Sequence, residues 1–326
     1  MIEQLAEKLR AARSVVLSTH RHCDGDGLGA QLALFHALTK LGKETRVLNV
    51  DRPPKKYAFL GTDKFVGVHG DHRSALKPSD LALILDTNDE RLVEPLFTEL
   101  KTHCREVVFV DHHPILEKGP KPTAGSIIDT SAASTGEIAY SLIKALGIEL
   151  DAQIARGLYT SIAFDTQMFR YVKSDPRSHL IAAELLAFER EPEVVHRRLF
   201  ATHTVEKMGL LARALSQVEY FDSARIACIR MSAEDFRSRD LGVDESGDVI
   251  DLIMQIESVV VAALLREDEP GKFKLSLRSK GPKVLPVAES FGGGGHAFAA
   301  GAFVPGNYES IRDRLLAEIR ARSQNA

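Results

Sequence analysis

Short apolar runs that alternate with helical patterns through the first 130 residues limit the possible folds most. Four runs are clear and a shorter one is a candidate fifth: 14–20 (SVVLSTH), 44–50 (ETRVLNV), 81–89 (LALILDTND), 105–114 (REVVFVDHHP) and 124–129 (AGSIID). Nearly continuous apolar runs are typical of strands buried on both faces, and the intervening helices supply the crossovers between parallel strands. The sequence therefore predicts an α/β domain with a mostly parallel sheet flanked by helices.

The rest of the chain first turns helical and then β-rich. The segment STGEIAYSLIKALG begins with Ser134, which is followed three residues later by Glu137 in a capping box. Three later runs read as strands, and a final amphipathic pattern reads as a helix: 224–232, 258–267, 272–281 and 308–324. Because 326 residues exceed one ordinary domain, we expect two. We place the domain with the parallel sheet at 1–187, a helical linker at 188–217 and a smaller α/β domain with a mixed sheet at 218–326.

Composition narrows the class of protein. The net charge is -3, so no global basic field attracts nucleic acid, and a polyanion must be held by local groups or by metal. No apolar run approaches the ~20 residues that span a bilayer, and the amphipathic start does not resemble a signal peptide. Three widely separated cysteines argue against disulfides and for a reducing compartment. We therefore expect a soluble, cytoplasmic protein without a membrane partner.

Acidic and histidine residues follow three of the predicted strands. They belong to the stretch THRHCDGDG (19–27), to ILDTND at Asp86 and to VDHHP. Ligands of open parallel sheets bind outside the carboxyl ends of the strands. Together with Asp165, which lies in an apolar helical run, the candidate metal ligands are His20, Asp24, Asp26, Asp86, His112 and Asp165. Carboxylates and imidazoles suit Mn²⁺, Mg²⁺, Fe²⁺ or Zn²⁺, and two ions ~3.5–4 Å apart can activate water for attack on phosphorus.

Each of these features alone has a purely structural explanation. Asp86 is placed like a helix N-cap, and DGDG could be a turn or a calcium loop, although the glutamate that completes an EF-hand is missing. The DHH triplet could be an aspartate that orients one histidine, and Asp165 could be a cap or a buried core acid. Their joint occurrence in an alternating α/β chain favours the metal site.

A second candidate site is the glycine run at 292–295, which His296 follows. Alone, such a run most often marks a flexible turn before a helix. The alternative is a phosphate site, where glycines let backbone N–H groups approach the anion closely. Arg278 and Ser279, at the end of a predicted strand, would supply a bidentate cation and a hydroxyl.

The motifs THRHCDGDG, ILDTND, VDHHP and IAFDTQMFRY resemble, in order, the four motifs of the DHH phosphoesterases. The stretch KLSLRSKGPKVLPVAESFGGGGHAFAAGA resembles the associated C-terminal DHHA1 domain with its Gly-Gly-Gly-His signature. Within that family, the chain is most similar to the two-domain oligoribonuclease and pAp phosphatase branch. It departs from the pattern at Cys23, Gly27 and Gln167, where proline, alanine and glycine are commoner.

The resemblance implies a site with two divalent ions, most often Mn²⁺. One ion would be bound by His20 and Asp24, and the other by Asp26, His112 and Asp165, with Asp86 bridging both. His113 would face the scissile phosphate, and Asp111 would lie behind it as an orienting group. The nucleotide end of the substrate would be held by Arg278, Ser279, Gly294, Gly295 and His296.

The activity that this resemblance implies is hydrolysis of oligoribonucleotides of two to five residues to mononucleotides, and of pAp to AMP. It also implies a homodimer. Alternatives are a phosphodiesterase for cyclic or linear dinucleotides and a non-enzymatic nucleotide sensor, which would be expected to lack some of the six ligands. A pyrophosphatase is disfavoured by the glycine-histidine signature, and a long-strand exonuclease by the lack of a further nucleic-acid-binding domain.

Overall fold

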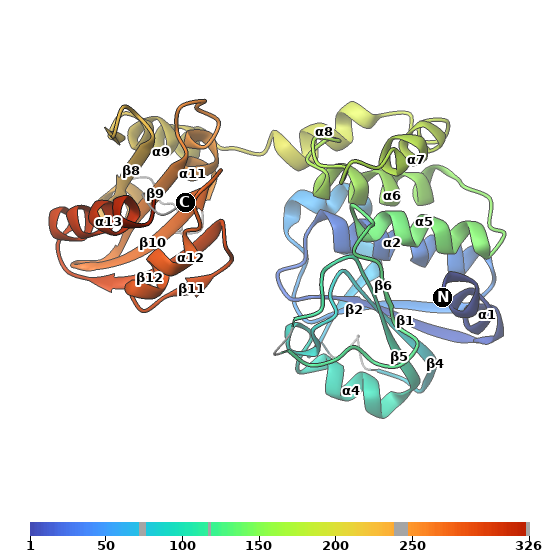
Figure 1. Cartoon of the computed structure of the whole chain (residues 1–326). Helices are drawn as coiled ribbons and strands as arrows, with labels where there is room; N and C mark the ends of the chain where they lie inside the picture. Colours follow the sequence, from blue (N-terminus) through green and yellow to red (C-terminus); the bar gives the residue numbers. More distant parts are fainter. Residues whose placement is uncertain (72–75, 117–118, 238–246, 324–326) are drawn as a thin grey trace. The chain divides into compact units, whose positions relative to one another are not determined.

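The computed structural model describes residues 1–71, 76–116, 119–237 and 247–323 (Figure 1). The chain divides into two compact units, Met1–Thr202 and His203–Ala326. Helix α8 (Pro192–Phe200) lies in the first unit and α9 (Val205–Leu215) in the second. The linker boundaries at 188 and 217 stay a prediction of the sequence.

The first unit is built on a six-stranded sheet in the order β3-β2-β1-β4-β5-β6. Every neighbouring pair is parallel, which confirms the predicted sheet. The strands are β1 (Ser14–Thr19), β2 (Glu44–Asn49), β3 (Val66–Val68), β4 (Ser79–Leu85), β5 (Cys104–Asp111) and β6 (Ile127–Ile128). The sequence analysis missed β3 because three half-buried residues are too short for a periodic pattern.

Helices cover both faces of this sheet (Figure 1). On one face lie α2 (Gly25–Lys40) and α5 (Thr135–Ala145), with α6 (Ala152–Asp165) packed on both of them. Further helical segments of the unit are α1 (Ile2–Ala11), η1 (Lys55–Leu60), α3 (Thr62–Phe65), η3 (Glu90–Leu92), α4 (Leu96–His103) and α7 (Arg177–Leu185). Helix α4 packs on the opposite face, so successive residues of one strand enter different cores, as Leu83 and Ile84 do. Burial on both faces is why the strands read as unbroken apolar runs.

Helices α2 and α6 touch backbone to backbone. A Cβ on Gly29 would lie 2.5 Å from the carbonyl oxygen of Gly157, which leaves no room for any side chain there. This contact fixes one helix against the other along their length. It also matters for the site, because Asp24 and Asp26 lie at the start of α2 and Asp165 at the end of α6.

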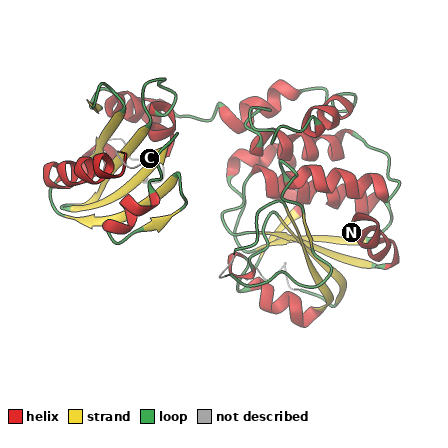
Figure 2. Ribbon diagram, in the orientation of Figure 1, coloured by secondary structure: helices red, strands yellow, loops and turns green. Residues whose placement is uncertain are grey.

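The second unit has a mixed sheet, whose strands are yellow in Figure 2. Their order is β11-β12-β10-β9-β8-β7. Only β8 and β9 pair in parallel among these strands, and the other pairs are antiparallel. The strands are β7 (Glu219–Phe221), β8 (Ile226–Met231), β9 (Val261–Glu269), β10 (Lys272–Ser279), β11 (Gly294–Gly295) and β12 (Ala299–Pro305). This confirms the smaller α/β domain, although β7, β11 and β12 were not predicted.

Helices of the second unit pack on both faces of its sheet. They are α9, α10 (Ala233–Arg237), α11 (Gly247–Ile253), α12 (Leu285–Ser290) and α13 (Tyr308–Ser323). Residues of α12 and α13 belong to one core, and residues of α9, α10 and α11 belong to the other. Among the described residues of both units, no helix is sufficiently long and apolar to cross a bilayer.

Candidate metal centre and phosphate groove

Strands β1, β4 and β5 are neighbours in the sheet, so the residues that follow them meet at one edge. Three groups of side chains there could each hold a metal ion, with ligand atoms within 4.8 Å of one another. They are His20, Asp24 and Asp86; Asp26, His112 and Asp165; and Asp86, Asp111, His112 and His113. The structure therefore brings all six predicted ligands together, along with the predicted Asp111 and His113.

Asp86 lies at the centre of the cluster. Its Oδ2 is 3.4 Å from Nε2 of His20, and its Oδ1 is 3.7 Å from Nε2 of His112. The Thr135 hydroxyl donates to Oδ1 at 3.1 Å. Asp86 has a φ of +63°, a left-handed conformation that is unfavourable for a residue with a side chain. One carboxylate oxygen of Asp86 faces each half of the cluster, as a bridging ligand requires.

The N-terminus of α5 holds Asp26. Its Oδ2 accepts from the backbone N–H of Thr135 at 2.9 Å, and its Oδ1 accepts from that of Gly136 at 3.2 Å. The Ser161 hydroxyl also donates to Oδ1. First-turn N–H groups of a helix have no partner within the helix and are free to bind a carboxylate. Burial and the neighbouring Asp165 nonetheless raise the pKa of Asp26 to about 8.

His112 points one ring nitrogen at the carboxylates. Its Nδ1 is 3.3 Å from the Ala132 carbonyl oxygen, while its Nε2 is 3.4 Å from Asp26 and 3.3 Å from Asp165. Burial, and then the adjacent His113, lower the pKa of His112 to about 4, so the ring is neutral at pH 7. Within the described residues, the buried Nε2 has no hydrogen-bond partner. A buried polar atom without a partner is costly, and a metal ion would supply the missing contact.

Crowded carboxylates give a second reason to expect a cation. Burial, and then the nearby Asp26, raise the pKa of Asp86 well above its usual value. Burial, and then Asp24, raise the pKa of Asp165 to about 6. Divalent ions among these groups would offset their repulsion. The oxygen and nitrogen donors suit such ions, so the cluster can hold metal.

His113 and Asp111 form a separate pair beside the cluster. Fully buried Asp111 accepts from Nδ1 of His113 at 2.8 Å through Oδ1, and from the Asn88 amide at 2.6 Å through Oδ2. This hydrogen bond to Asp111 raises the pKa of His113. The His113 side chain is 55% exposed, so its other nitrogen can donate to an incoming anion.

Several residues that shape the cluster were not identified from the sequence. Asn88, Thr135 and Ser161 each donate to one of its carboxylates. Asn88 lies in the ILDTND motif and Thr135 in the capping box, but neither pattern indicates which distant carboxylate it contacts. His22, which was not among the candidate ligands, uses its backbone N–H to bind Asp51 at 2.7 Å.

The second unit contains a groove of about 500 Å³ between β10, the glycine run and β12. Arg278, Gly294 and Gly295 line it, whereas Ser279 and His296 are not among the lining residues. A Cβ on Gly293 would lie 2.0 Å from the Gly301 carbonyl oxygen, so only glycine allows this close packing on β12. The groove is open, with exposed backbone at Gly294 and Gly295.

Lys274 and Ser276 also line the groove, and the sequence analysis did not single them out. They share a face of β10 with Arg278, because side chains of a strand alternate. The intervening Leu275 and Leu277 are buried on the other face. This period of two is visible in the sequence, and it could have identified both residues.

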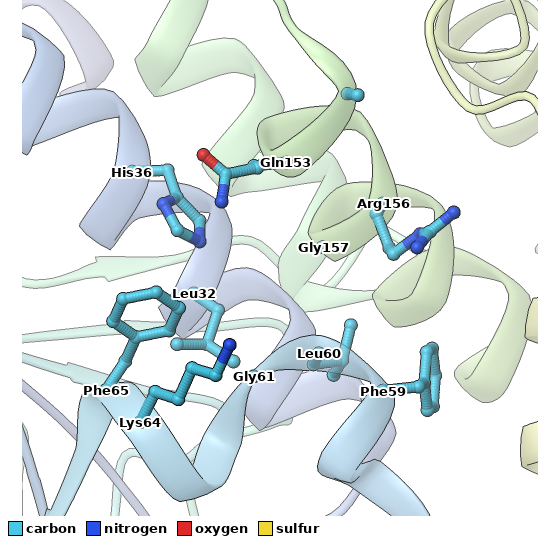
Figure 3. Close-up of a pocket in the computed structure, with 11 residues that line it drawn as sticks. Leu32, His36, Phe59, Leu60, Gly61, Lys64, Phe65, Gln153, Arg156 and Gly157 are labelled. Atoms are coloured by element: carbon cyan, nitrogen blue, oxygen red, sulfur yellow. The ribbon is translucent and has the colours of Figure 1, made fainter.

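A different cavity, of about 280 Å³, lies between α2, α3 and α6 of the first unit (Figure 3). Its described lining residues include His36, Lys64 and Arg156 but no carboxylate. Arg156 is already paired with Glu189 at 2.7 Å and with Glu191 at 3.1 Å. The cavity therefore lacks the ligand set that the Asp86 cluster has.

Fold and site together define a two-domain α/β protein with a buried His–Asp cluster at the edge of a parallel sheet. Residues 14–162 match the DHH family, N-terminal domain, and residues 230–324 match the DHHA1 domain. The chain is 31% identical to the bifunctional oligoribonuclease and PAP phosphatase NrnA of Thermus thermophilus, over 97% of this chain and 92% of that protein. The chain belongs to the DHH family, in the branch of these bifunctional relatives, which confirms the resemblance seen in its motifs.

Two further comparisons agree. The Bacillus subtilis protein of the same name is 24% identical over 98% of this chain and 97% of its own length. A crystal structure of an exopolyphosphatase-related protein from Bacteroides fragilis superposes with a TM-score of 0.85 at 22% identity. It covers 98% of this chain and 95% of that one, which shows a shared fold.

Proposed function

We propose that this protein is a metal-dependent phosphoesterase that hydrolyses short oligoribonucleotides to mononucleotides and pAp to AMP. The observation that carries the proposal is the buried cluster around Asp86, in which Nε2 of His112 has no hydrogen-bond partner among the described residues. Relatives over nearly the whole chain are named for these two activities. Hydrolysis of a phosphate ester is the chemistry that two clustered divalent ions support best.

The proposed centre holds two divalent ions, with Mn²⁺ as the preferred metal. His20 and Asp24 would bind one ion, while Asp26, His112 and Asp165 would bind the other. Asp86, with one oxygen toward each group, would contact both. When bound, the ions would supply an activated water and neutralise charge on the phosphate.

The protein's own groups would orient the phosphate. His113 is exposed, and its hydrogen bond to Asp111 raises its pKa, which favours the protonated ring that donates a charged hydrogen bond to a phosphate oxygen. Asp111 holds the ring through Nδ1 and thereby directs Nε2 outward. The amide of Asn88 fixes Asp111 in turn. This chain of contacts would stabilise negative charge that develops on the phosphate.

In the second unit, the groove would hold the nucleotide end of the substrate. Arg278 can grip a phosphate with two N–H groups, and the backbone at Gly294 and Gly295 is open to an anion. Ser279 and His296, outside the lining residues, would act at its margin. A groove of about 500 Å³ is large enough for a nucleotide.

A matched turnover assay in Mn²⁺ tests the proposal. It compares a 5′-phosphorylated diribonucleotide, pAp, a long single strand, a cyclic dinucleotide and pyrophosphate, with Asp86→Asn protein as the blank. We expect the diribonucleotide and pAp to be cleaved fastest. Preference for the cyclic dinucleotide or pyrophosphate would refute the assigned substrate class while leaving the metal centre in place. Binding of nucleotides without turnover of any of them would refute an enzymatic role.

A further inference from the structure

The segment after α6 adopts an unusual backbone conformation. Five non-glycine residues between 167 and 174 have positive φ angles of 48° to 66°; they are Gln167, Met168, Phe169, Lys173 and Ser174. Left-handed conformations are unfavourable for such residues, and clusters of them are characteristic of functional sites. Here the hydrogen bond from the Tyr171 N–H to the Thr166 carbonyl oxygen, at 3.0 Å, helps to hold the turn. The turn directs the chain back toward the loop that precedes α5.

Lys173 contacts that loop through its ammonium group. Its Nζ donates to the carbonyl oxygen of Thr130 at 3.0 Å and to that of Ala132 at 2.7 Å. The Ala132 carbonyl is also the group that lies 3.3 Å from Nδ1 of His112. One carbonyl oxygen therefore links Lys173 to a proposed metal ligand.

The Ala132 carbonyl sets the orientation of the His112 ring. A ring that donates from Nδ1 to a carbonyl keeps a lone pair on Nε2, and partners of this kind fix both tautomer and direction in metal sites. Nε2 then points toward Asp26 and Asp165. We propose that Lys173 is a positioning residue: by clamping the Ala132 carbonyl, it aims His112 at the ion shared with Asp26 and Asp165. This inference rests on the two-ion centre proposed above.

Other contacts already hold the loop together, so the effect of Lys173 should be specific. The Arg177 guanidinium lies 3.3 Å from Asp129 and 3.4 Å from the Ser131 hydroxyl. The Ser134 hydroxyl caps α5 by accepting from the Glu137 N–H. Loss of the ammonium should therefore free the 130 and 132 carbonyls without unfolding the loop.

The other half of the cluster is held independently of Lys173. Nδ1 of His20 contacts the Arg21 carbonyl oxygen at 2.8 Å, and Asp24 caps α2 by accepting from two of its N–H groups. The ion bound by His20 and Asp24 should thus be insensitive to a change at Lys173. Weaker binding of only one of the two ions would indicate a positioning role, whereas general destabilisation would weaken the binding of both.

The test is Mn²⁺ titration of metal-free protein by calorimetry, with wild type, Lys173→Met and Lys173→Arg compared. We expect Lys173→Met to bind one ion at least tenfold more weakly and the other within twofold of wild type, in line with the usual effect of groups that orient metal ligands. Lys173→Arg, which can still donate to both carbonyls, should restore binding. Turnover by the methionine variant should recover as Mn²⁺ is raised, because the defect lies in ion occupancy.

Lys40→Met is the matched control, because Lys40 also donates to a backbone carbonyl of the first unit, that of Glu149 at 2.9 Å. The Lys40→Met change should leave the affinity for both ions unchanged. The inference would be overturned if Lys173→Met weakened the binding of both ions equally, if it bound Mn²⁺ with wild-type affinity, or if Lys173→Arg did not restore binding. It would also be overturned if the wild-type protein bound fewer than two ions. Two ions with the expected split, but no hydrolysis of RNA or pAp, would instead refute the proposed function and leave this inference standing.

Discussion

In the first unit the site consists of buried acids and imidazoles, whereas in the second it is an open groove with cationic and glycine residues. Asp26, Asp86 and His112 are at most 6% exposed. Backbone or hydroxyl donors hold the two carboxylates in place, and the Ala132 carbonyl oxygen lies 3.3 Å from Nδ1 of His112. Arg278 is only partly buried, and Gly294 is exposed. Metal ions demand fixed ligand geometry, while a nucleotide can be held by a looser set of contacts. Substitutions in the first unit should therefore abolish activity, whereas substitutions in the second unit should reduce it by degrees.

The largest effect is expected from Asp86→Asn. Loss of the central carboxylate removes a group that is close to both halves of the cluster, so kcat/KM should fall at least about a thousandfold. The same change should stabilise the metal-free protein, because a buried carboxylate with a raised pKa is lost. Turnover assays and thermal melting in a chelator measure the two effects.

Asp89→Asn is the control for this variant. Asp89 is three residues further along and forms an ion pair with Arg91 at 2.6 Å outside the cluster. The Asp89→Asn variant should retain activity. If Asp86→Asn kept its turnover while folded, the first unit would not contain the metal centre, and the contrast between the two units would disappear.

A smaller, graded effect is expected from Arg278→Ala. Hydrogen bonds to charged groups contribute ~1.5–3 kcal/mol, so KM should rise roughly tenfold to a hundredfold. The kcat value should change little, because the His–Asp cluster in the first unit is intact. Steady-state kinetics with a diribonucleotide separate these constants. A fall in kcat as large as that of Asp86→Asn would show that the groove takes part in the chemical step.

The sequence predicted the parts of the site that follow from local pattern. Strand periodicity placed His20, Asp86 and His112 at strand ends, and parallel topology then required them to meet. The contacts of Asp26 with Thr135 and Gly136 were not predictable, because they join residues more than one hundred positions apart. Left-handed φ at Asp86 also leaves no residue-type signal, since glycine would be the expected residue there.

The second unit was harder to predict for a different reason. Strand β11 consists of two glycines, which have weak strand propensity and normally mark turns. Strand β12 (Ala299–Pro305) pairs with both β10 and β11, but its small residues do not form a strong alternating pattern. Propensity therefore indicated a loop where sheet pairing formed strands.

The pH dependence of stability should also distinguish the two units, because it should depend on the buried carboxylates of the first unit and not on the groove of the second. In metal-free protein, burial raises the pKa of Asp26 from its ordinary value of 3.8 to about 8. Between those values the folded state keeps a proton that the unfolded state releases, so stability should fall as pH rises, by up to ~1.4 kcal/mol per unit for each such proton. Above about pH 8 this loss is complete. Denaturant unfolding from pH 4 to 8 in a chelator measures it.

Saturating Mn²⁺ should flatten that profile, because the ions compete with protons for the same carboxylates. The comparison variant is Arg278→Ala, which should follow the wild-type profile with and without metal. Stability that rises with pH in the chelator would mean that the buried carboxylates are ionised without a cation, contrary to the crowding inferred for the first unit.

The smallest effect is expected from Lys274→Ala, and it should depend on substrate length. Lys274 is four residues from Arg278 on the same face of β10, or ~13 Å at the rise of a strand. A second phosphate could reach it only in a substrate longer than pAp. The KM for a pentaribonucleotide should therefore rise a few-fold, and that for pAp should not change. Lys272→Ala is the control, because that lysine pairs with Glu269 at 2.6 Å. Equal increases for both substrates would mean that the groove acts as one undivided anion site rather than as a track for successive phosphates.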